Sequence, residues 1–227
     1  MRHCTGLQTL SRWLRQLATH LPVVLAGLLV AWTGSLRLGV LWFAASRIAY
    51  VLYVGLTLAW VARHGPASLR EGPEKAWLRF RSISSWLMDN DAVAFGALCI
   101  VSIDSFAPAV PRWVPVAAGA VLFAVGVGVK TWAAASLDPG AYHWRNFFVP
   151  RKEGGLSAAG PYRWLKNPMY TLGYAHAYGF ALAFCSGPGL LAAAFAQALM
   201  LTLNQLVERP HLPAAAAEES DARDATR

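Results

Sequence analysis

Residues 114–136 read VPVAAGAVLFAVGVGVKTWAAAS, an apolar stretch that contains a single charged residue, Lys130. A helix needs roughly 20 apolar residues to cross the hydrocarbon core of a bilayer, so this stretch is long enough to span a membrane. Similar stretches recur, and the six predicted spans are about 17–36, 38–62, 92–111, 114–136, 168–186 and 188–207. The sequence therefore predicts an all-α fold, a polytopic membrane helical bundle of about six transmembrane helices.

Short breaks arrange these spans in pairs. Residues 34–39, 111–114 and 186–189 are rich in Gly, Pro and Ser and separate the two members of each pair. Three helical hairpins result, joined by long polar loops at 63–91 and 137–167. Lys and Arg collect on the cytoplasmic side of membrane helices, and 16 of the 20 fall on the side that holds both chain ends. Both termini are therefore predicted to be cytoplasmic.

The first span has an alternative interpretation. A basic start followed by the apolar run 21–31 resembles a secretory signal, which would be cleaved from the mature protein. The segment before the run is long, however, and no clear cleavage site with small residues follows it. We therefore expect a retained membrane helix.

Composition supports a membrane protein and excludes other classes. The 227 residues are 56% hydrophobic and 14% charged, with a mean hydropathy of +0.38, which is too apolar for an ordinary soluble domain. The net charge is +8, but the basic residues lie between apolar runs and form no basic tract, so we expect no nucleic-acid partner. Three scattered cysteines predict no metal site and no disulfide. We divide the chain into N-terminal membrane helices (1–112), a catalytic membrane core (113–212) and a disordered tail (213–227).

Three charged residues fall within predicted spans, where they are costly unless paired or close to the interface. Arg47 and Asp104 lie at similar predicted depths, so we expect an ion pair between them. Lys130 is about six residues from the inner end of its span. It would either extend to the interface or line a ligand cavity.

A dense group of polar and cationic residues lies just before the fifth predicted span. Residues 160–173 read GPYRWLKNPMYTLG. Asn167 is placed as the N-cap of that span, and Pro168 is in its first turn, where a helix accepts proline. Backbone N–H groups at a helix N-terminus bind carboxylates and phosphates. The stretch therefore predicts a site for a charged molecule at the membrane surface.

These residues also carry a family resemblance. The pattern GPYRxxKNPxYxxG at 160–173 resembles the signature of membrane-embedded methyltransferases, which include isoprenylcysteine carboxyl methyltransferases and phospholipid N-methyltransferases. The carboxyl methyltransferases have Arg-His-Pro-x-Tyr where this chain has KNPMY at 166–170. Together with YHWRNFF at 142–148 and VERPH at 207–211, the pattern is closest to phosphatidylethanolamine N-methyltransferases.

The resemblance implies S-adenosylmethionine as cofactor, bound at the cytoplasmic ends of the last four helices. Glu208 matches an acidic residue that follows the final hairpin, and Arg209 stands where many relatives have a second acid. Arg163 or Arg209 would hold the cofactor carboxylate. The residues expected to bind the cofactor are Gly160, Tyr162, Arg163, Asn167, Pro168, Tyr170, Gly173, Glu208 and Arg209.

Methyl transfer to an amine sets further requirements. A cationic sulfonium favours aromatic faces, and an ethanolamine amine must lose a proton before attack. Glu208 or His143 would be the proton acceptor, and Tyr170 is the third residue assigned to catalysis. Arg145 and its neighbours would hold the lipid phosphate, unless they are ordinary cytoplasmic charges. The residues expected to bind the acceptor are Tyr142, Trp144, Arg145, Phe148 and Arg151.

The function predicted from the sequence is S-adenosylmethionine-dependent methylation of a membrane lipid, most simply the amine of phosphatidylethanolamine or its partly methylated forms. The lipid would enter from the bilayer to an active site facing the cytoplasm, with no metal. One alternative is another lipophilic acceptor, such as a prenylated-cysteine carboxylate. A membrane reductase that uses NADPH is a second, and a non-catalytic membrane protein or small transporter is a third.

Overall fold

The computed structural model describes residues 20–137, 140–149, 160–165 and 167–210, and every regular element within them is helical. A short apolar helix, His20–Thr33, comes first. The α-helices that follow are α2 (Leu36–His64), α3 (Pro73–Val101), α4 (Trp113–Ala135), α5 (Arg145–Phe148), α6 (Ala175–Ala183) and α7 (Gly187–Leu203). The prediction of an all-α fold is confirmed.

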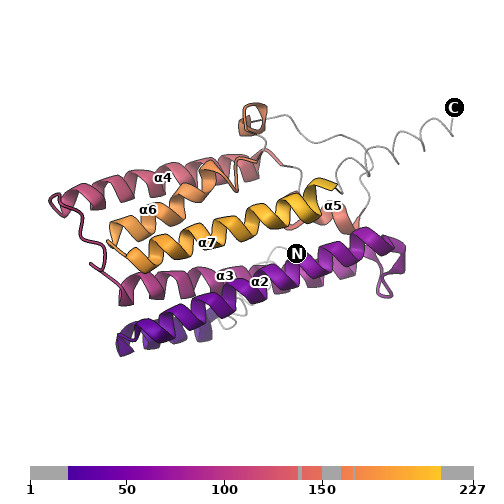
Figure 1. Cartoon of the computed structure of the whole chain (residues 1–227). Coiled ribbons are helices and arrows are strands. Elements are labelled where there is room, and N and C mark those ends of the chain that lie inside the picture. Colours follow the sequence, from indigo (N-terminus) through magenta and orange to yellow (C-terminus); the bar gives the residue numbers. More distant parts are fainter. Residues whose placement is uncertain (1–19, 138–139, 150–159, 166, 211–227) are drawn as a thin grey trace, which may run out of the picture.

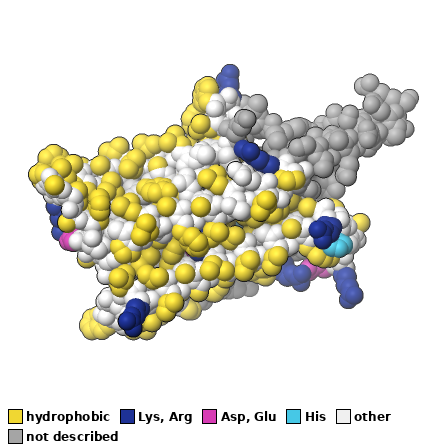
Figure 2. Space-filling model, in the orientation of Figure 1, with side chains coloured by type: hydrophobic (Ala, Val, Ile, Leu, Met, Phe, Trp, Pro, Cys, Tyr) yellow, Lys and Arg dark blue, Asp and Glu magenta, His cyan; other side chains and the backbone are white. Residues whose placement is uncertain are grey.

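Three helices are long and apolar enough to cross a membrane: α2, α4 and the continuous helical segment Gly187–Glu208. Figure 1 shows them running along the long axis of the bundle, with α4 and α6 on one side, α2 and α3 on the other and α7 between. Figure 2 shows a mostly apolar face along this axis, with Lys and Arg gathered near its ends. This distribution fits a protein that spans a bilayer.

Local sequence explains where the helices begin and end. The hydroxyl of Ser35 accepts a hydrogen bond from the backbone N–H of Leu38 and so caps α2. Ser186 caps α7 in the same way through Gly189 N–H, at 2.8 Å. Ser, with its short hydroxyl side chain, is a favoured N-cap because it satisfies a donor left free by the first turn. These caps lie at two of the predicted breaks.

Two predicted boundaries were wrong. The third span was placed at 92–111, but α3 begins at Pro73 and ends at Val101, so most of the predicted loop 63–91 is helical. Charged residues in 74–91 lower the hydropathy there without preventing a helix. The fifth span was placed at 168–186, but α6 covers only Ala175–Ala183.

Asn167 is therefore not the N-cap of α6, contrary to the prediction. Its backbone carbonyl accepts hydrogen bonds from Tyr170 N–H and Thr171 N–H, which makes it the start of a turn. Thr171 then adopts φ −101° and ψ −97°, which breaks any helix at that point. A 3₁₀ turn, Leu172–Tyr174 (η4), leads into α6.

Helices α4 and α6 approach each other closely through small residues. A Cβ added to Gly126 of α4 would lie 2.1 Å from the backbone N of His176, and one added to Gly179 of α6 would lie 2.3 Å from the backbone N of Phe123. Only glycine permits such contact, as at many helix interfaces in membranes. The other faces of α4 are largely exposed, so α4 forms an outer wall of the bundle.

Candidate active site

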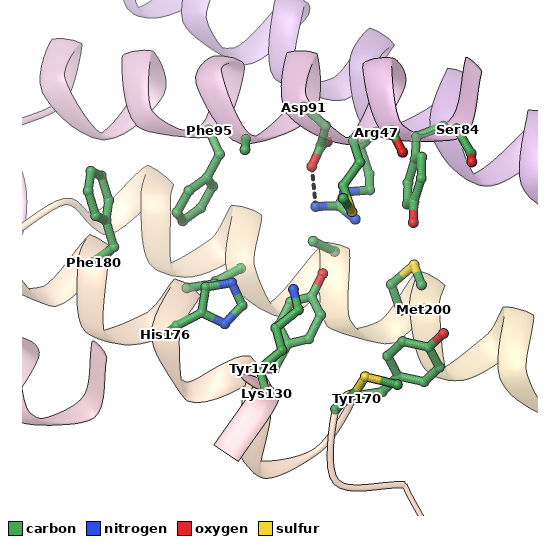
Figure 3. A pocket seen from close by; sticks show the side chains of 18 of the residues that line it. Arg47, Ser84, Asp91, Phe95, Lys130, Tyr170, Tyr174, His176, Phe180 and Met200 are labelled. Atoms are coloured by element: carbon green, nitrogen blue, oxygen red, sulfur yellow. Dashed lines mark hydrogen bonds and ion pairs between the residues drawn. The ribbon is translucent and has the colours of Figure 1, made fainter. Parts of the chain in front are cut away.

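A cavity of about 310 Å³ lies inside the bundle, between α2 and α3 on one side and α4, α6 and α7 on the other (Figure 3). Its volume is within the range of small-molecule sites, which are concave and mostly apolar with a few placed polar groups. The cavity has a rim of Tyr142, His143, Trp144 and Tyr170, which lie outside the long helices.

The polarity of the residues that line the cavity changes with depth. Below the rim, Arg47 and Asp91 contribute an ion pair to the wall, and Lys130 and His176 come from the opposite side. The floor is apolar and includes Phe95, Phe123 and Phe180, and the ring of Phe180 lies against both of the others. Rim, polar middle and apolar floor together form an amphipathic cavity.

Glu208 stands behind the rim and is held by three side chains. Its Oε1 accepts hydrogen bonds from Trp144 Nε1 at 2.8 Å and from the Tyr170 hydroxyl at 2.9 Å, while its Oε2 accepts one from Asn204 Nδ2 at 2.6 Å. A carboxylate can accept about four such bonds. Glu208 therefore fixes two rim aromatics and keeps capacity for a ligand donor.

Local backbone irregularities accompany this carboxylate. Asn204–Glu208 forms a π-helical turn (η5) at the end of α7, and π-turns are frequent at functional sites. Trp144 has φ +53°, a left-handed conformation that a bulky side chain rarely adopts. Its bond to Glu208 and its edge contact with Phe80 hold it there. Such strain, of order 1–3 kcal/mol, occurs preferentially at functional sites.

Tyr162 also lies near the Glu208 carboxylate. It lies in the 3₁₀ turn Gly160–Arg163 (η3). Burial and the nearby Glu208 carboxylate raise the pKa of Tyr162 to about 12. The phenol is therefore neutral at pH 7 and available as a hydrogen-bond donor.

His143 is the ionisable residue at the rim. One of its ring nitrogens, Nε2, lies 3.0 Å from the Ser85 hydroxyl, and its backbone carbonyl accepts a hydrogen bond from Trp77 Nε1 at 3.1 Å. Burial, and then the positive charge of Arg81, lower the pKa of His143 below its ordinary value. The imidazole is therefore neutral at pH 7 and can accept a proton.

The predicted ion pair between Arg47 and Asp104 was wrong. Arg47 pairs with Asp91 of α3, and Asp104 pairs with Arg112 near the bundle end, at 3.2 Å. The reason is the position of α3, which places Asp91 opposite Arg47 and leaves Asp104 beyond its last residue. Lys130 was predicted either to extend to the interface or to line a cavity, and in the structure it lines the cavity.

The other residues predicted for the acceptor are dispersed. Arg145 bonds to Glu74 at 2.9 Å and lies over the ring of Trp77, in an open pocket beside the main cavity. Phe148 is buried in the core against Phe80. Arg151 lies outside the described residues, as does the predicted tail.

The residues predicted for the cofactor lie along the segment that leads from η3 to α6, and at the end of α7. Pro168 and Gly173 are buried, and a Cβ on Gly173 would lie 3.5 Å from Lys130 Cβ. Gly160 has φ +57°. Arg163 and Arg209 are exposed, and Asn167 is half-buried. The structure thus brings Tyr162 and Tyr170 close to Glu208, while the two arginines stay at the surface.

Sequence reasoning missed the contribution of α3. Ser84, Met88, Asp91 and Phe95 line the cavity and are spaced by four, three and four residues, which places them on one face of a helix. This periodicity was available in the sequence. The charged residues of 63–91 predict a polar loop instead, which hides the periodicity.

Part of this site lies in a region that is similar to known proteins. Residues 114–215 match the family model described as phospholipid methyltransferase. They include α4 to α7, the rim and Glu208, but neither α2 nor α3. No solved structure matches the chain.

Individual relatives are more specific. The chain is 31% identical over 146 residues to the phosphatidylethanolamine N-methyltransferase of Clavispora lusitaniae, covering 60% of this chain and 17% of that protein. Proteins of the same name from Yarrowia lipolytica and Pyricularia oryzae are 29% and 30% identical, over 60% and 63% of this chain and 15% of each relative. The chain thus spans less than a fifth of these relatives. The resemblance inferred from the sequence is confirmed.

Proposed function

We propose that the protein is an S-adenosylmethionine-dependent methyltransferase that acts on the amine of phosphatidylethanolamine or of its partly methylated forms. One observation carries the proposal. The region similar to phospholipid methyltransferases places a carboxylate, Glu208, against two rim aromatics at the mouth of an amphipathic cavity. A cationic donor and a lipid acceptor both fit this combination.

The residues at the rim suit the cofactor. When bound, S-adenosylmethionine supplies a methyl group on a cationic sulfur. Trp144 and Tyr170 present aromatic faces, which attract cations, and Glu208 holds both rings in position. The remaining acceptor capacity of Glu208 would take a hydrogen bond from the cofactor's amino group or ribose. Tyr162, beside the same carboxylate, would donate one.

His143 is the better placed of the two predicted proton acceptors. It lines the cavity, whereas Glu208 stands behind the rim and already accepts three hydrogen bonds. A neutral imidazole can take the proton that the ethanolammonium group must lose before its nitrogen has a lone pair for attack. Ser85 would hold the ring in orientation through its hydroxyl.

The charges at the two ends of the bundle support a membrane orientation. In Figure 1 helix α5 and the C-terminal ends of α2 and α7 lie at one end of the bundle, and the C-terminal end of α3 and the N-terminal end of α4 lie at the other. Basic residues favour the cytoplasmic side. We therefore place the rim on that side, so that the cofactor would enter from the cytosol and the lipid from the bilayer.

The test is methyl transfer with purified protein and labelled S-adenosylmethionine. Vesicles would carry phosphatidylethanolamine in one sample and a prenylated-cysteine peptide in another. We expect label in methylated phosphatidylethanolamine and none in a base-labile methyl ester. No measurable cofactor binding would overturn the methyltransferase assignment, and label in the ester alone would overturn the acceptor.

A further inference from the structure

The polar middle of the cavity contains hydrogen-bonding groups without partners. Arg47 of α2 and Asp91 of α3 are only 8% and 4% exposed. They bond to each other through Nη2 and Oδ2, but Arg47 Nε and Asp91 Oδ1 have no hydrogen-bond partner among the described residues. A buried polar atom left unpaired is costly, about 1–3 kcal/mol or more when charged. The bond to Asp91 therefore does not satisfy every donor of the Arg47 guanidinium.

The charge in this region is also unbalanced. Lys130 lines the same cavity from α4, across from Arg47 and Asp91 (Figure 3). Among the described residues that line the cavity, Arg47 and Lys130 are the Lys and Arg side chains and Asp91 is the single carboxylate. The wall therefore carries an excess positive charge at a depth where charge is expensive. A bound anion would neutralise it.

The surroundings indicate what kind of molecule brings the anion. On the floor side lie Phe95, Phe123 and Phe180, which form an apolar surface. On the rim side lies His143, the proposed proton acceptor. An amphiphile whose anionic group lies between an apolar chain and a reactive amine matches this order. A phospholipid with an ethanolamine headgroup has that arrangement.

We propose that Arg47 and Lys130 bind the phosphodiester of the acceptor lipid. Asp91 is a positioning residue that holds the Arg47 guanidinium, and the phenylalanine floor takes part of an acyl chain. This assignment rests on the proposed function for the identity of the lipid. Arg47 and Asp91 belong to helices outside residues 114–215, so the family match assigns them no role.

The test measures lipid and cofactor binding separately in the purified full chain. Lys130→Met removes one cation, and Arg47→Met/Asp91→Leu removes the pair together, because deleting one partner would leave an unpaired buried charge. Lys130→Arg keeps the charge. Arg37→Met removes an exposed cation from α2 outside the cavity and is the matched control. Native mass spectrometry would give the Kd of phosphatidylethanolamine and of diacylglycerol, and calorimetry that of S-adenosylmethionine.

We expect Lys130→Met and the double variant to raise the Kd of phosphatidylethanolamine about 10–100-fold, as for the loss of a charge-assisted hydrogen bond. Lys130→Arg keeps the charge and Arg37→Met alters a residue outside the cavity. Both should keep the Kd of phosphatidylethanolamine within about threefold of the parent value, a difference well under 1.4 kcal/mol. Diacylglycerol, which has no phosphate, should bind all variants alike, and so should S-adenosylmethionine.

Three results would overturn the inference. They are an unchanged Kd for phosphatidylethanolamine, an equal loss for diacylglycerol, and a loss confined to S-adenosylmethionine. The last would assign the cations to the cofactor carboxylate. If the parent protein binds phosphatidylethanolamine but not S-adenosylmethionine, the methyltransferase proposal fails while the phosphate site stands.

Discussion

At the scale of single residues, the site depends on one carboxylate that organises its neighbours. Glu208 joins the end of α7 to Trp144 and Tyr170, which come from two other segments of the chain. Hydrogen bonds to a charged acceptor contribute about 1.5–3 kcal/mol each. A left-handed Trp144 can persist under these conditions because its side chain is fixed on both sides.

Glu208→Gln tests that role. The amide is nearly the same size but loses the charge, so we expect S-adenosylmethionine to bind about 10–100-fold more weakly, with a modest fall in Tm. Isothermal calorimetry and thermal unfolding would measure the two effects. Glu71→Gln, which alters a surface pair with Arg79, should change neither. Equal cofactor affinity in parent and Glu208→Gln would remove Glu208 from the site.

His143 gives a prediction for pH. Its lowered pKa keeps the imidazole neutral, so the acid limb of kcat/KM should lie below pH 6.5. Arg81→Met removes a nearby positive charge, which makes protonation of His143 easier and raises its pKa. The acid limb should therefore move to higher pH, as measured by initial rates from pH 5 to 8.

The control for this shift is Arg79→Met, which removes a cation on the same helix that forms an ion pair with Glu71. Its acid limb should stay in place. His143→Gln should lower kcat by about 10²–10⁴, the usual contribution of a general base. A His143→Gln enzyme with parental kcat would exclude the residue as proton acceptor.

At the scale of elements, the contact between α4 and α6 controls the shape of the cavity. Lys130 and Phe123 belong to α4, and His176 and Phe180 belong to α6. The two helices meet where Gly126 lies against the backbone of His176. Any side chain there would move cavity-lining residues on both helices.

Gly126→Ala should therefore destabilise the protein by about 1–3 kcal/mol or more, as expected for overpacking. Gly128→Ala is the matched control on the same helix, because a Cβ there has no heavy atom within 4 Å. Thermal unfolding in detergent should show a lower Tm for Gly126→Ala and an equal or higher Tm for Gly128→Ala. Equal Tm values for the two variants would show that the close contact at Gly126 does not contribute to stability.

The elements also show what sequence can predict. Apolar length located α2, α4 and α7, and the breaks near Ser35 and Ser186 were found because Gly, Pro and Ser interrupt a helix locally. The extent of α3 was missed because the charged residues in its first half lower the hydropathy, although that half also packs Ala76, Trp77 and Phe80 into the core. The motif identified Glu208 and Tyr170, but their hydrogen bond depends on long-range packing that no local pattern encodes.

At the scale of the whole molecule, the proposed orientation places the rim in the cytosol. Single cysteines at Arg63 and Arg112, both exposed and at opposite ends of the bundle, test it in a Cys4→Ser background. Cys99 and Cys185 are buried and should react slowly. In intact cells, an impermeant maleimide should label Arg112→Cys only, and after lysis it should label both. Labelling of Arg63→Cys in intact cells would reverse the orientation.

The walls of the cavity come from both halves of the chain. Arg47, Tyr50 and Asp91 face the cavity from α2 and α3, before the stretch that matches the methyltransferases. A fragment starting near residue 113 would keep Glu208 and the rim aromatics but leave the cavity open along one side. Truncation would also remove Phe80, one of the two contacts that hold Trp144, and Ser85, which bonds to His143, so the rim itself depends on the N-terminal helices. Under the proposed function, exchanging these helices between relatives should change which lipids are accepted.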